Sequence, residues 1–319
     1  MSLKTCLAGA LLLFGLVPAA AQDAPPPHTE SVTVTGLKDA EKTIAQFVQG
    51  LTVPTRAADK IARWKDGVCP IAVGIRQEIG VFLIRRIMEV AAQVGAPVNN
   101  KVPCPPNIEI IFTATPQALL DNIWIMHPTL LGPYENSAQA ERLATSRSPV
   151  QALYGTGTVD LRGQVVPDGG RKGGVTMTMA MPPAGFGGPA TGAPDMVVMN
   201  IPDGVATNVT GSRLGDGVSS AITNVVIVAD TPNLIDRGVI VLADYMAMLA
   251  LAQIKPPESC QELPTILNLM VPGCAQSPTA LTSGDIAFLR GLYKITATAT
   301  FHGQQREMQY QMKQSLGVP

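Results

Sequence analysis

The sequence predicts an α+β protein in which helices pack against a mixed sheet. Residues 222–229, ITNVVIVA, form a short run rich in β-branched side chains, which is typical of a buried strand. From Arg237 to Gln253 the chain is almost wholly apolar, which is typical of a helix inside a core. Residues 70–126 alternate strand, helix, strand and helix patterns, and this order favours helices packed on a sheet.

The amino terminus has the three parts of a secretory signal peptide. Lys4 precedes the apolar run LAGALLLFGLV, and a run of three alanines ends at residue 21. We therefore expect residues 1–21 to be removed and the mature chain to be periplasmic or secreted. Residues 22–30 have the composition of a disordered leader, and residues 31–319 are long enough for one domain with its own core.

Charge and hydropathy exclude two classes of partner. The chain has 23 basic and 24 acidic residues, without the clustered basic excess that nucleic-acid-binding proteins show. No stretch after the signal peptide is long and apolar enough to span a membrane. We expect no nucleic-acid partner and no membrane span in the mature chain, and an envelope protein is a candidate partner.

Four cysteines remain once Cys6 leaves with the signal peptide. An even number in an oxidising compartment indicates two disulfides. We favour Cys69 with Cys104 and Cys260 with Cys274, because each bond would join the ends of a local chain segment beside a predicted helix or strand. The sequence leaves the other pairings open. The chain has no C-x-x-C motif and no histidine near these residues, so structural bonds are favoured over a zinc site or a reactive thiol.

Hydrophobic spacing predicts the elements of the amino-terminal half. Residues 31–36 alternate like a strand, residues 38–49 have helical spacing, and residues 70–75 and 107–114 are apolar enough for buried strands.

Two helices of this half carry end signals. The helical spacing of Gln77–Val94 stops at Gly95, a common helix C-cap residue. Thr115 is expected to cap the next helix, with Pro116 in its first turn and Met126 near its end.

Residues 150–164 are expected to form an extended ribbon. Gly155 and Gly157 within it do not make a dinucleotide loop, because no third glycine follows at the required spacing and no helix opens there. Residues 163–195 are rich in glycine and proline, and we interpret them as a surface insertion. They contain no G-x-x-x-x-G-K-[ST] motif for a phosphate.

A methionine-rich strand is predicted inside this insertion, and the sequence does not decide whether it joins the main sheet. Alternation places Val175, Met177, Met179 and Met181 on one face. Thioethers are soft ligands that select Cu(I), which an exported protein would meet. The alternative is that these methionines pack on a half-buried strand.

End signals also mark the C-terminal half. Asp236 is expected to cap the apolar helix, and the proline pair at 256–257 to stop it. Thr282 and Asp285 have the spacing of a capping box. Residues 295–312, ITATATF and EMQYQM around His302-Gly303, are expected to form a C-terminal β-hairpin.

After the apolar helix come TILN at residues 265–268 and LTSGDIAFLRGLY at residues 281–293. This order resembles a family of exported bacterial proteins of unknown function with a zincin-like, metalloprotease-type fold. In that family a helix with an H-E-x-x-H-like or H-E-x-x-Q run is followed by an S-I-F-N segment and an L-T-x-x-D-x-x-L-L-x-x-L-Y helix. The resemblance covers the C-terminal third of the chain and implies a zincin-like scaffold.

The metal site of that family is missing here. In the register that the resemblance implies, the metal-binding run falls on Ala243-Asp244-Tyr245-Met246-Ala247. A zincin needs two imidazoles one turn apart to hold zinc and a carboxylate to activate water. Alanine occupies both histidine positions, and His28, His127 and His302, the chain's three histidines, supply no such pair.

No other catalytic motif takes its place. The chain has no G-x-S-x-G elbow. Asp244, Tyr245 and Asp285 are the candidates for a non-standard hydrolase site, in which a desolvated Asp244 would act as acid or base. The structural alternative is that Asp244 accepts hydrogen bonds from backbone or tyrosine groups and that Asp285 caps its helix.

Together these observations predict an exported, non-catalytic, disulfide-linked protein without a cofactor, on a degenerate zincin-like scaffold, that acts by binding or in the structure of the cell envelope. Two alternatives remain: a hydrolase with a site around Asp244 and Asp285, and a periplasmic Cu(I)-binding protein that uses Met177, Met179 and Met181.

Overall fold

The computed structural model describes residues 39–101, 103–134, 136–160, 162–168, 175–181, 195–201, 217–274 and 278–319. The predicted signal peptide, the leader, the strand at 31–36 and most of the predicted insertion lie outside these residues.

The centre of the fold is a mixed sheet with the strand order β2-β3-β8-β4-β5. Its strands are β2 (Pro70–Val73), β3 (Ile108–Thr113), β8 (Ser219–Asp230), β4 (Val150–Val159) and β5 (Val165–Pro167). Strands β2, β3 and β8 are parallel, whereas β4 is antiparallel to both β8 and β5. A sixth strand, β1 (Arg63–Trp64), pairs in parallel with the start of β8. The predicted α+β class with a mixed sheet is confirmed.

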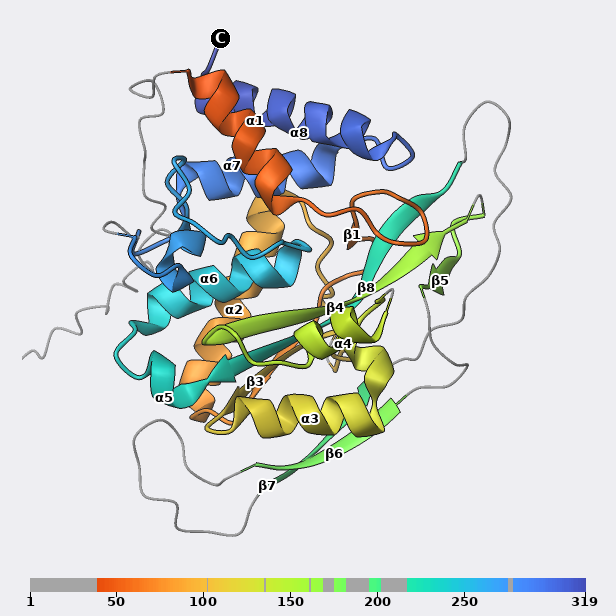
Figure 1. The fold of residues 1–319 in the computed structure, drawn as a ribbon, viewed down its shortest axis with the longest axis vertical. Coiled ribbons are helices and arrows are strands. Elements are labelled where there is room, and N and C mark those ends of the chain that lie inside the picture. The colour runs from red at the N-terminus through yellow and green to blue at the C-terminus, as the bar shows by residue number, and fades with distance from the viewer. Residues whose placement is uncertain are drawn as a thin grey trace, which may run out of the picture.

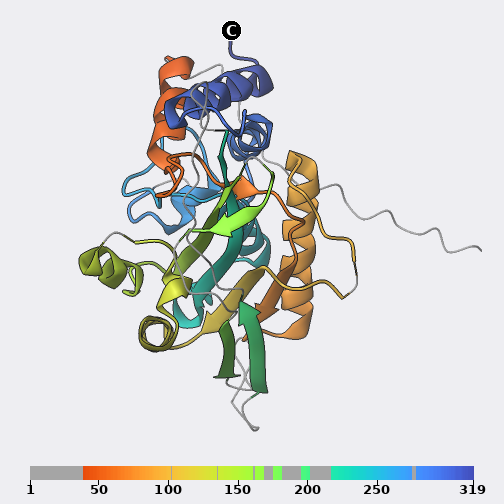
Figure 2. The same cartoon turned by 90° about the vertical axis from the view of Figure 1, so that its right-hand side faces the viewer.

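Helices cover both faces of this sheet, as Figures 1 and 2 show. One face carries α2 (Gln77–Val94) and α6 (Val239–Leu251), and we call it the α6 face. The opposite face carries α3 (Pro116–Met126) and the 3₁₀ helix η2 (Pro128–Leu131), and we call it the α3 face. The remaining helices are α1 (Ala40–Leu51), α4 (Ser137–Leu143), α5 (Thr231–Leu234), η3 (Ile266–Met270), α7 (Ser283–Lys294) and α8 (Phe301–Leu316).

Strand alternation divides the core into two clusters. Ile108, Ile110 and Phe112 of β3 belong to the large cluster on the α6 face. Ile111 of the same strand belongs to a smaller cluster on the α3 face, together with Leu120 of α3. Successive side chains of a strand point to opposite faces, so the two clusters follow from one nearly continuous apolar run.

Local end signals placed several helices correctly. Helix α2 spans the predicted Gln77–Val94, and Gly95 ends it in the left-handed region at φ 83°. Helix α3 follows Thr115 with Pro116 in its first turn, although the Thr115 side chain makes no capping bond. The Thr282–Asp285 capping box of α7 is present in full.

Helix α6 starts two residues later than predicted, and its N-cap is Gly238 rather than Asp236. The short helix α5 precedes it, and the Arg237 amide donates to Leu234 at the end of α5. Asp236 is therefore in the turn between two helices, where it is exposed.

The predicted C-terminal hairpin is wrong, because residues Phe301–Leu316 form helix α8. The Thr300 side chain accepts a hydrogen bond from the Gly303 amide at its start. Gln304, Met308 and Met312 are buried at a spacing of four residues, which is a helical period that places them on one face. Helix α8 packs against α7 and α1 (Figure 1), and this packing with distant elements outweighs the local alternation of EMQYQM.

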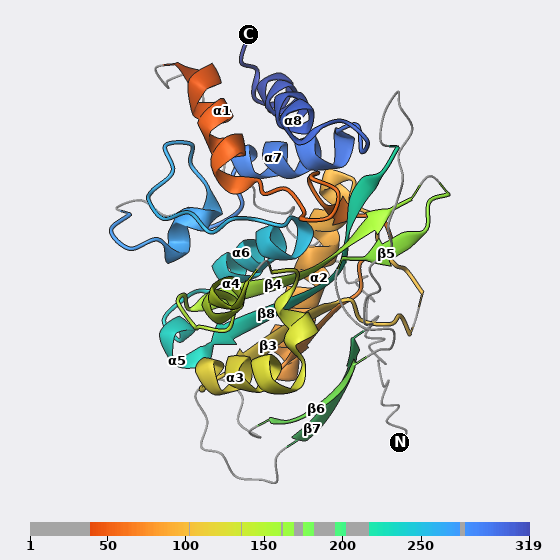
Figure 3. The ribbon, with the colours of Figure 1, turned by 45° about the vertical axis from the view of Figure 1, so that its right-hand side comes forward.

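The methionine-rich segment forms β6 (Val175–Met181), which pairs in antiparallel register with β7 (Asp195–Ile201). These strands make a two-stranded ribbon that is not hydrogen-bonded to the main sheet (Figure 3). The predicted insertion also contains β5, which does belong to the main sheet.

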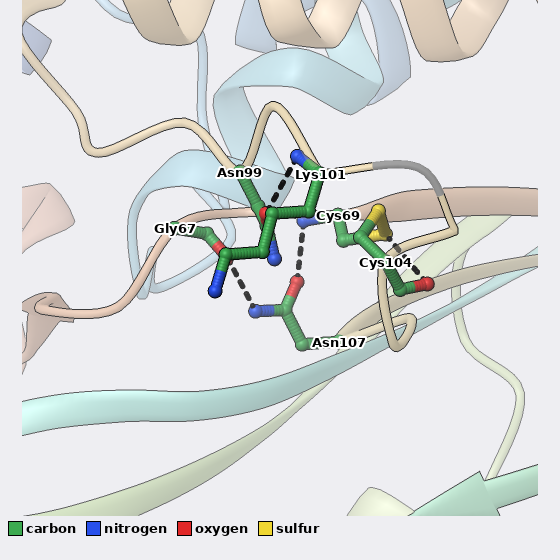
Figure 4. Close-up of a disulfide and its surroundings, with 6 residues drawn as sticks. All are labelled: Gly67, Cys69, Asn99, Lys101, Cys104 and Asn107. Carbon is green, nitrogen blue, oxygen red and sulfur yellow. Dashed lines mark hydrogen bonds between the residues drawn. A yellow bond between two sulfur atoms is a disulfide. The ribbon is translucent and has the colours of Figure 1, made fainter.

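The favoured disulfide pairing is confirmed. Cys69 is bonded to Cys104 and Cys260 to Cys274, with Cα separations of 6.2 and 5.5 Å. Asn107 fixes the first bridge: its Oδ1 accepts from the Cys69 amide at 2.7 Å, and its Nδ2 donates to Gly67 O at 3.1 Å (Figure 4).

Gly132 provides a test of the packing between η2 and β4. It has φ 85°, and a Cβ atom there would lie 2.3 Å from the Tyr154 carbonyl oxygen. We expect Gly132→Ala to lower the free energy of unfolding by about 3 kcal/mol or more, because strain and overlap add. Gly95→Ala is the matched control. It has a similar φ but open space, so it should cost only about 1 kcal/mol. Equal losses in urea titrations would show that the contact with β4 is not tight.

Candidate functional site

Helix α6, which carries the candidate residues, is buried without interruption from Leu242 to Leu251. The carbonyls of the last turn of a helix have no partner within it. Here three aromatic side chains donate to them: Tyr154 Oη to Leu249 at 3.0 Å, Trp64 Nε1 to Ala250 at 2.8 Å, and Tyr293 Oη to Leu251 at 2.7 Å. The donors come from β4, β1 and α7, so the end of α6 is joined to three other elements.

Asp244 lies in the middle of α6 and has no exposed surface. Arg86 of α2 approaches it with two nitrogens, Nε on Oδ1 and Nη2 on Oδ2 at 3.2 Å. The Leu281 amide donates to the same Oδ2 at 2.8 Å. Both oxygens of the carboxylate therefore have a partner, and the positive charge of Arg86 offsets its negative charge inside the core.

Asp285 is equally buried and accepts four hydrogen bonds. Thr265 Oγ1 donates to Oδ1, while the Ile266 amide and both the amide and the hydroxyl of Thr282 donate to Oδ2 at 2.9–3.0 Å. Burial raises the pKa of Asp285 to about 6, although these bonds lower it. The residues that carry the resemblance, Thr265 and Asp285, thus bond to each other.

The two carboxylates are neighbours through the backbone, since Asp244 binds the Leu281 amide and Asp285 the Thr282 amide. Tyr245 follows Asp244 in the same buried stretch, with 4% of its surface exposed, and burial raises its pKa. The structure brings the three candidate residues into one region, in which the two carboxylates hold α6, η3 and α7 together.

Metal ligands of the usual kinds are not grouped in the described part of the chain. No cluster of three His, Cys, Asp or Glu side chains that would hold a metal ion occurs among the described residues. Cys69, Cys104, Cys260 and Cys274 are bonded in pairs. His127 follows α3 as its C-cap.

The methionine candidates lie on β6, and the pairing of β6 with β7 identifies one more candidate, Met199. Met177 is paired with Met199 of β7, Met179 with Val197, and Met181 with Asp195. Met196, by contrast, is paired with Ala180, at the alternate set of positions. The sequence interpretation missed Met199, because only the pairing of β6 with β7 brings it opposite Met177.

A second group was missed by the sequence interpretation. In the described residues, buried side-chain atoms without a hydrogen-bond partner are Glu109 Oε2, Asn224 Nδ2 and Gln253 Oε1. Glu109 and Asn224 lie on the adjacent strands β3 and β8, where the sequence shows a lone carboxylate in NIEIIFT and a lone amide in ITNVVIV. A polar residue inside an apolar strand is the signal that would have identified them.

None of the described helices is long and apolar enough to cross a membrane. Comparison of the chain with protein-family models, with curated protein sequences and with solved structures finds no match.

The Arg86–Asp244 pair yields a direct test. We expect Arg86→Met to lower the free energy of unfolding by about 3–5 kcal/mol, because it leaves a buried charge unpaired. Adding Asp244→Asn should recover part of this loss, since the neutral amide oxygen still accepts from the Leu281 amide. Arg85→Met, the exposed neighbour, should change stability by no more than about 0.5 kcal/mol. If Arg86→Met and Arg85→Met unfold at the same urea concentration, the pair does not hold α6.

Proposed function

We propose that this chain is an exported, non-catalytic binding protein of the cell envelope, built on a zincin-like scaffold without its metal site. The observation that carries the proposal is the state of Asp244, the residue at the glutamate position of the metal-binding run. Both of its oxygens are engaged, by Arg86 and by the Leu281 amide. A carboxylate that activates water needs a free oxygen facing the substrate.

The flanking positions support the same proposal. Ala243 and Ala247, which occupy the two histidine positions, are both fully buried, so this side of α6 packs into the core. The hydrolase alternative would require Asp244 and Asp285 to leave their hydrogen bonds. Export is supported by the two disulfides, which form and persist in oxidising compartments.

The metal content of the mature protein tests the proposal. Protein purified from the periplasm without chelator should begin at Gln22 and should carry far less than one zinc per chain by elemental analysis. Near-stoichiometric zinc that survives dialysis would reject the loss of the metal site. A chain that keeps residues 1–21 and stays in the cytoplasm would reject export.

A second candidate function, Cu(I) binding, is favoured by the strand register of the β6–β7 ribbon. The register places Met199 of β7 directly opposite Met177 of β6, and Met179 and Met181 follow at alternate positions of β6. Opposed residues on paired strands are about 5 Å apart. One opposed pair of thioethers, with further methionines at positions 179 and 181 of the same strand, matches the soft ligand set that selects Cu(I).

Cu(I) competition with bicinchoninate, in ascorbate so that the disulfides stay oxidised, tests this function. We expect Met177→Leu and Met199→Leu each to weaken Cu(I) binding by about tenfold or more. Met196→Leu is the matched control, because Met196 takes the alternate register, and it should leave the affinity unchanged. Equal affinity in all three variants, or no Cu(I) bound by the wild type, would reject the ribbon as the site.

A further inference from the structure

Glu109 is a carboxyl group inside the α3 face of the sheet. It lies on strand β3, two residues before Ile111 of the α3-face cluster and therefore on the same face, and only 1% of its surface is exposed. Its register neighbours are apolar on both sides, Ile71 on β2 and Val226 on β8. None of the ion pairs between described residues includes it.

This environment favours the uncharged form of Glu109 at neutral pH. Burial raises the pKa of the Glu109 carboxyl to about 8, although a hydrogen bond from its own backbone amide lowers it. Tyr134 packs against this face, and His127 ends α3 half-buried. The charged groups of the covering helices, Asp121, Glu141 and Arg142, are exposed. A protonated carboxyl group offers one O–H donor in addition to its remaining acceptor capacity.

Asn224 lies on the same face of the neighbouring strand. It precedes Val226 by two residues, and 5% of its surface is exposed. Its Oδ1 accepts from Thr223 Oγ1 at 3.3 Å and lies over Gly155 of β4, where an added Cβ would come within 1.9 Å of it. The amide is thus fixed by a glycine that leaves room for it, and its Nδ2 has no partner among the described residues.

The two unpaired atoms are placed to share one partner. Glu109 is directly opposite Val226, so Asn224 is its diagonal neighbour, at a Cα separation of about 8 Å. An oxygen atom that accepts from both side chains would lie about 3 Å from each donor. A protonated carboxyl and an amide NH₂ are both donors, so the complementary group is an oxygen that accepts two hydrogen bonds. A buried polar atom without a partner destabilises the fold, so both atoms favour such a group.

We infer that Glu109 and Asn224 form a buried binding site for one uncharged oxygen acceptor, a water molecule in the free protein or the carbonyl or hydroxyl oxygen of a small ligand. Gly155 is a positioning residue of this site, because it fixes the Asn224 amide. The site is on the α3 face, apart from the carboxylates of α6 and α7, and it does not depend on the proposed function.

Water contact at Asn224 tests the inference directly. In ¹⁵N-labelled mature protein, the side-chain amide of Asn224 is identified by its loss in Asn224→Leu. We expect a rotating-frame cross-peak between this amide and water at pH 6, retained in Glu109→Gln and lost in Glu109→Leu. A cross-peak to a non-exchanging ligand proton instead would identify a bound small molecule. A wild-type amide with neither cross-peak would overturn the inference, since it would show a dry site or a direct bond between the two side chains.

Thermal unfolding gives an independent test. The folded pKa of Glu109 lies above its ordinary value of 4.5, so its contribution to stability is present at acid pH and is lost as the pH rises towards 8. The melting temperature of the wild type should therefore fall relative to that of Glu109→Gln between pH 5 and pH 8. Asp285 titrates in both proteins, so its effect on the melting temperature cancels in this comparison. If the melting temperatures of the two proteins change in parallel with pH, Glu109 is not held in its neutral form and cannot be the donor that the inference requires.

Substitution of both side chains completes the test. Glu109→Leu and Asn224→Leu should each lower the melting temperature, because each leaves the other group unpaired. The double variant should lose less than the sum, since no polar atom is then left without a partner. Additive losses would show that the two groups share nothing.

Discussion

The fold depends on satisfying the carbonyl groups at the end of helix α6 inside the core. A helix buried on every side cannot release its last carbonyls to water, and each one left unpaired costs about 1–3 kcal/mol. Tyr154, Trp64 and Tyr293 meet this requirement with side-chain donors. Because these residues come from the sheet, from the strand that follows α1 and from α7, the same bonds set the position of α6 against all three.

The carboxylate in the middle of α6 adds a second constraint. Asp244 can stay charged in the core only with its partners, Arg86 on α2 and the Leu281 amide before α7. This fixes the rotation of α6 about its axis, since any other rotation would leave the buried charge of Asp244 without Arg86. The residue with the strongest claim to catalysis in the sequence therefore has a structural role, and Asp285 has a similar one between η3 and α7.

Elements whose signals are local could be predicted, and those that depend on distant partners could not. The helix Gln77–Val94 and the Thr282–Asp285 capping box follow from spacing and caps within a few residues. Helix α8 was missed because its buried face exists only against α1 and α7. Arg86 was missed as the partner of Asp244 because 158 residues separate them, and Met199 because strand pairing alone places it opposite Met177.

Two buried carboxyl groups, Asp244 on the α6 face and Glu109 on the α3 face, avoid the cost of a buried charge in opposite ways. Asp244 has a cation and a backbone amide as partners. Among the described residues, Glu109 forms no ion pair and its Oε2 has no hydrogen-bond donor. An acid without such partners lowers its free energy by binding a proton, and it then becomes a donor in need of an acceptor. Asn224 beside it is a donor as well. Two unpaired donors on adjacent strands need an acceptor group between them. The inferred binding site therefore lies on the sheet and not on α6.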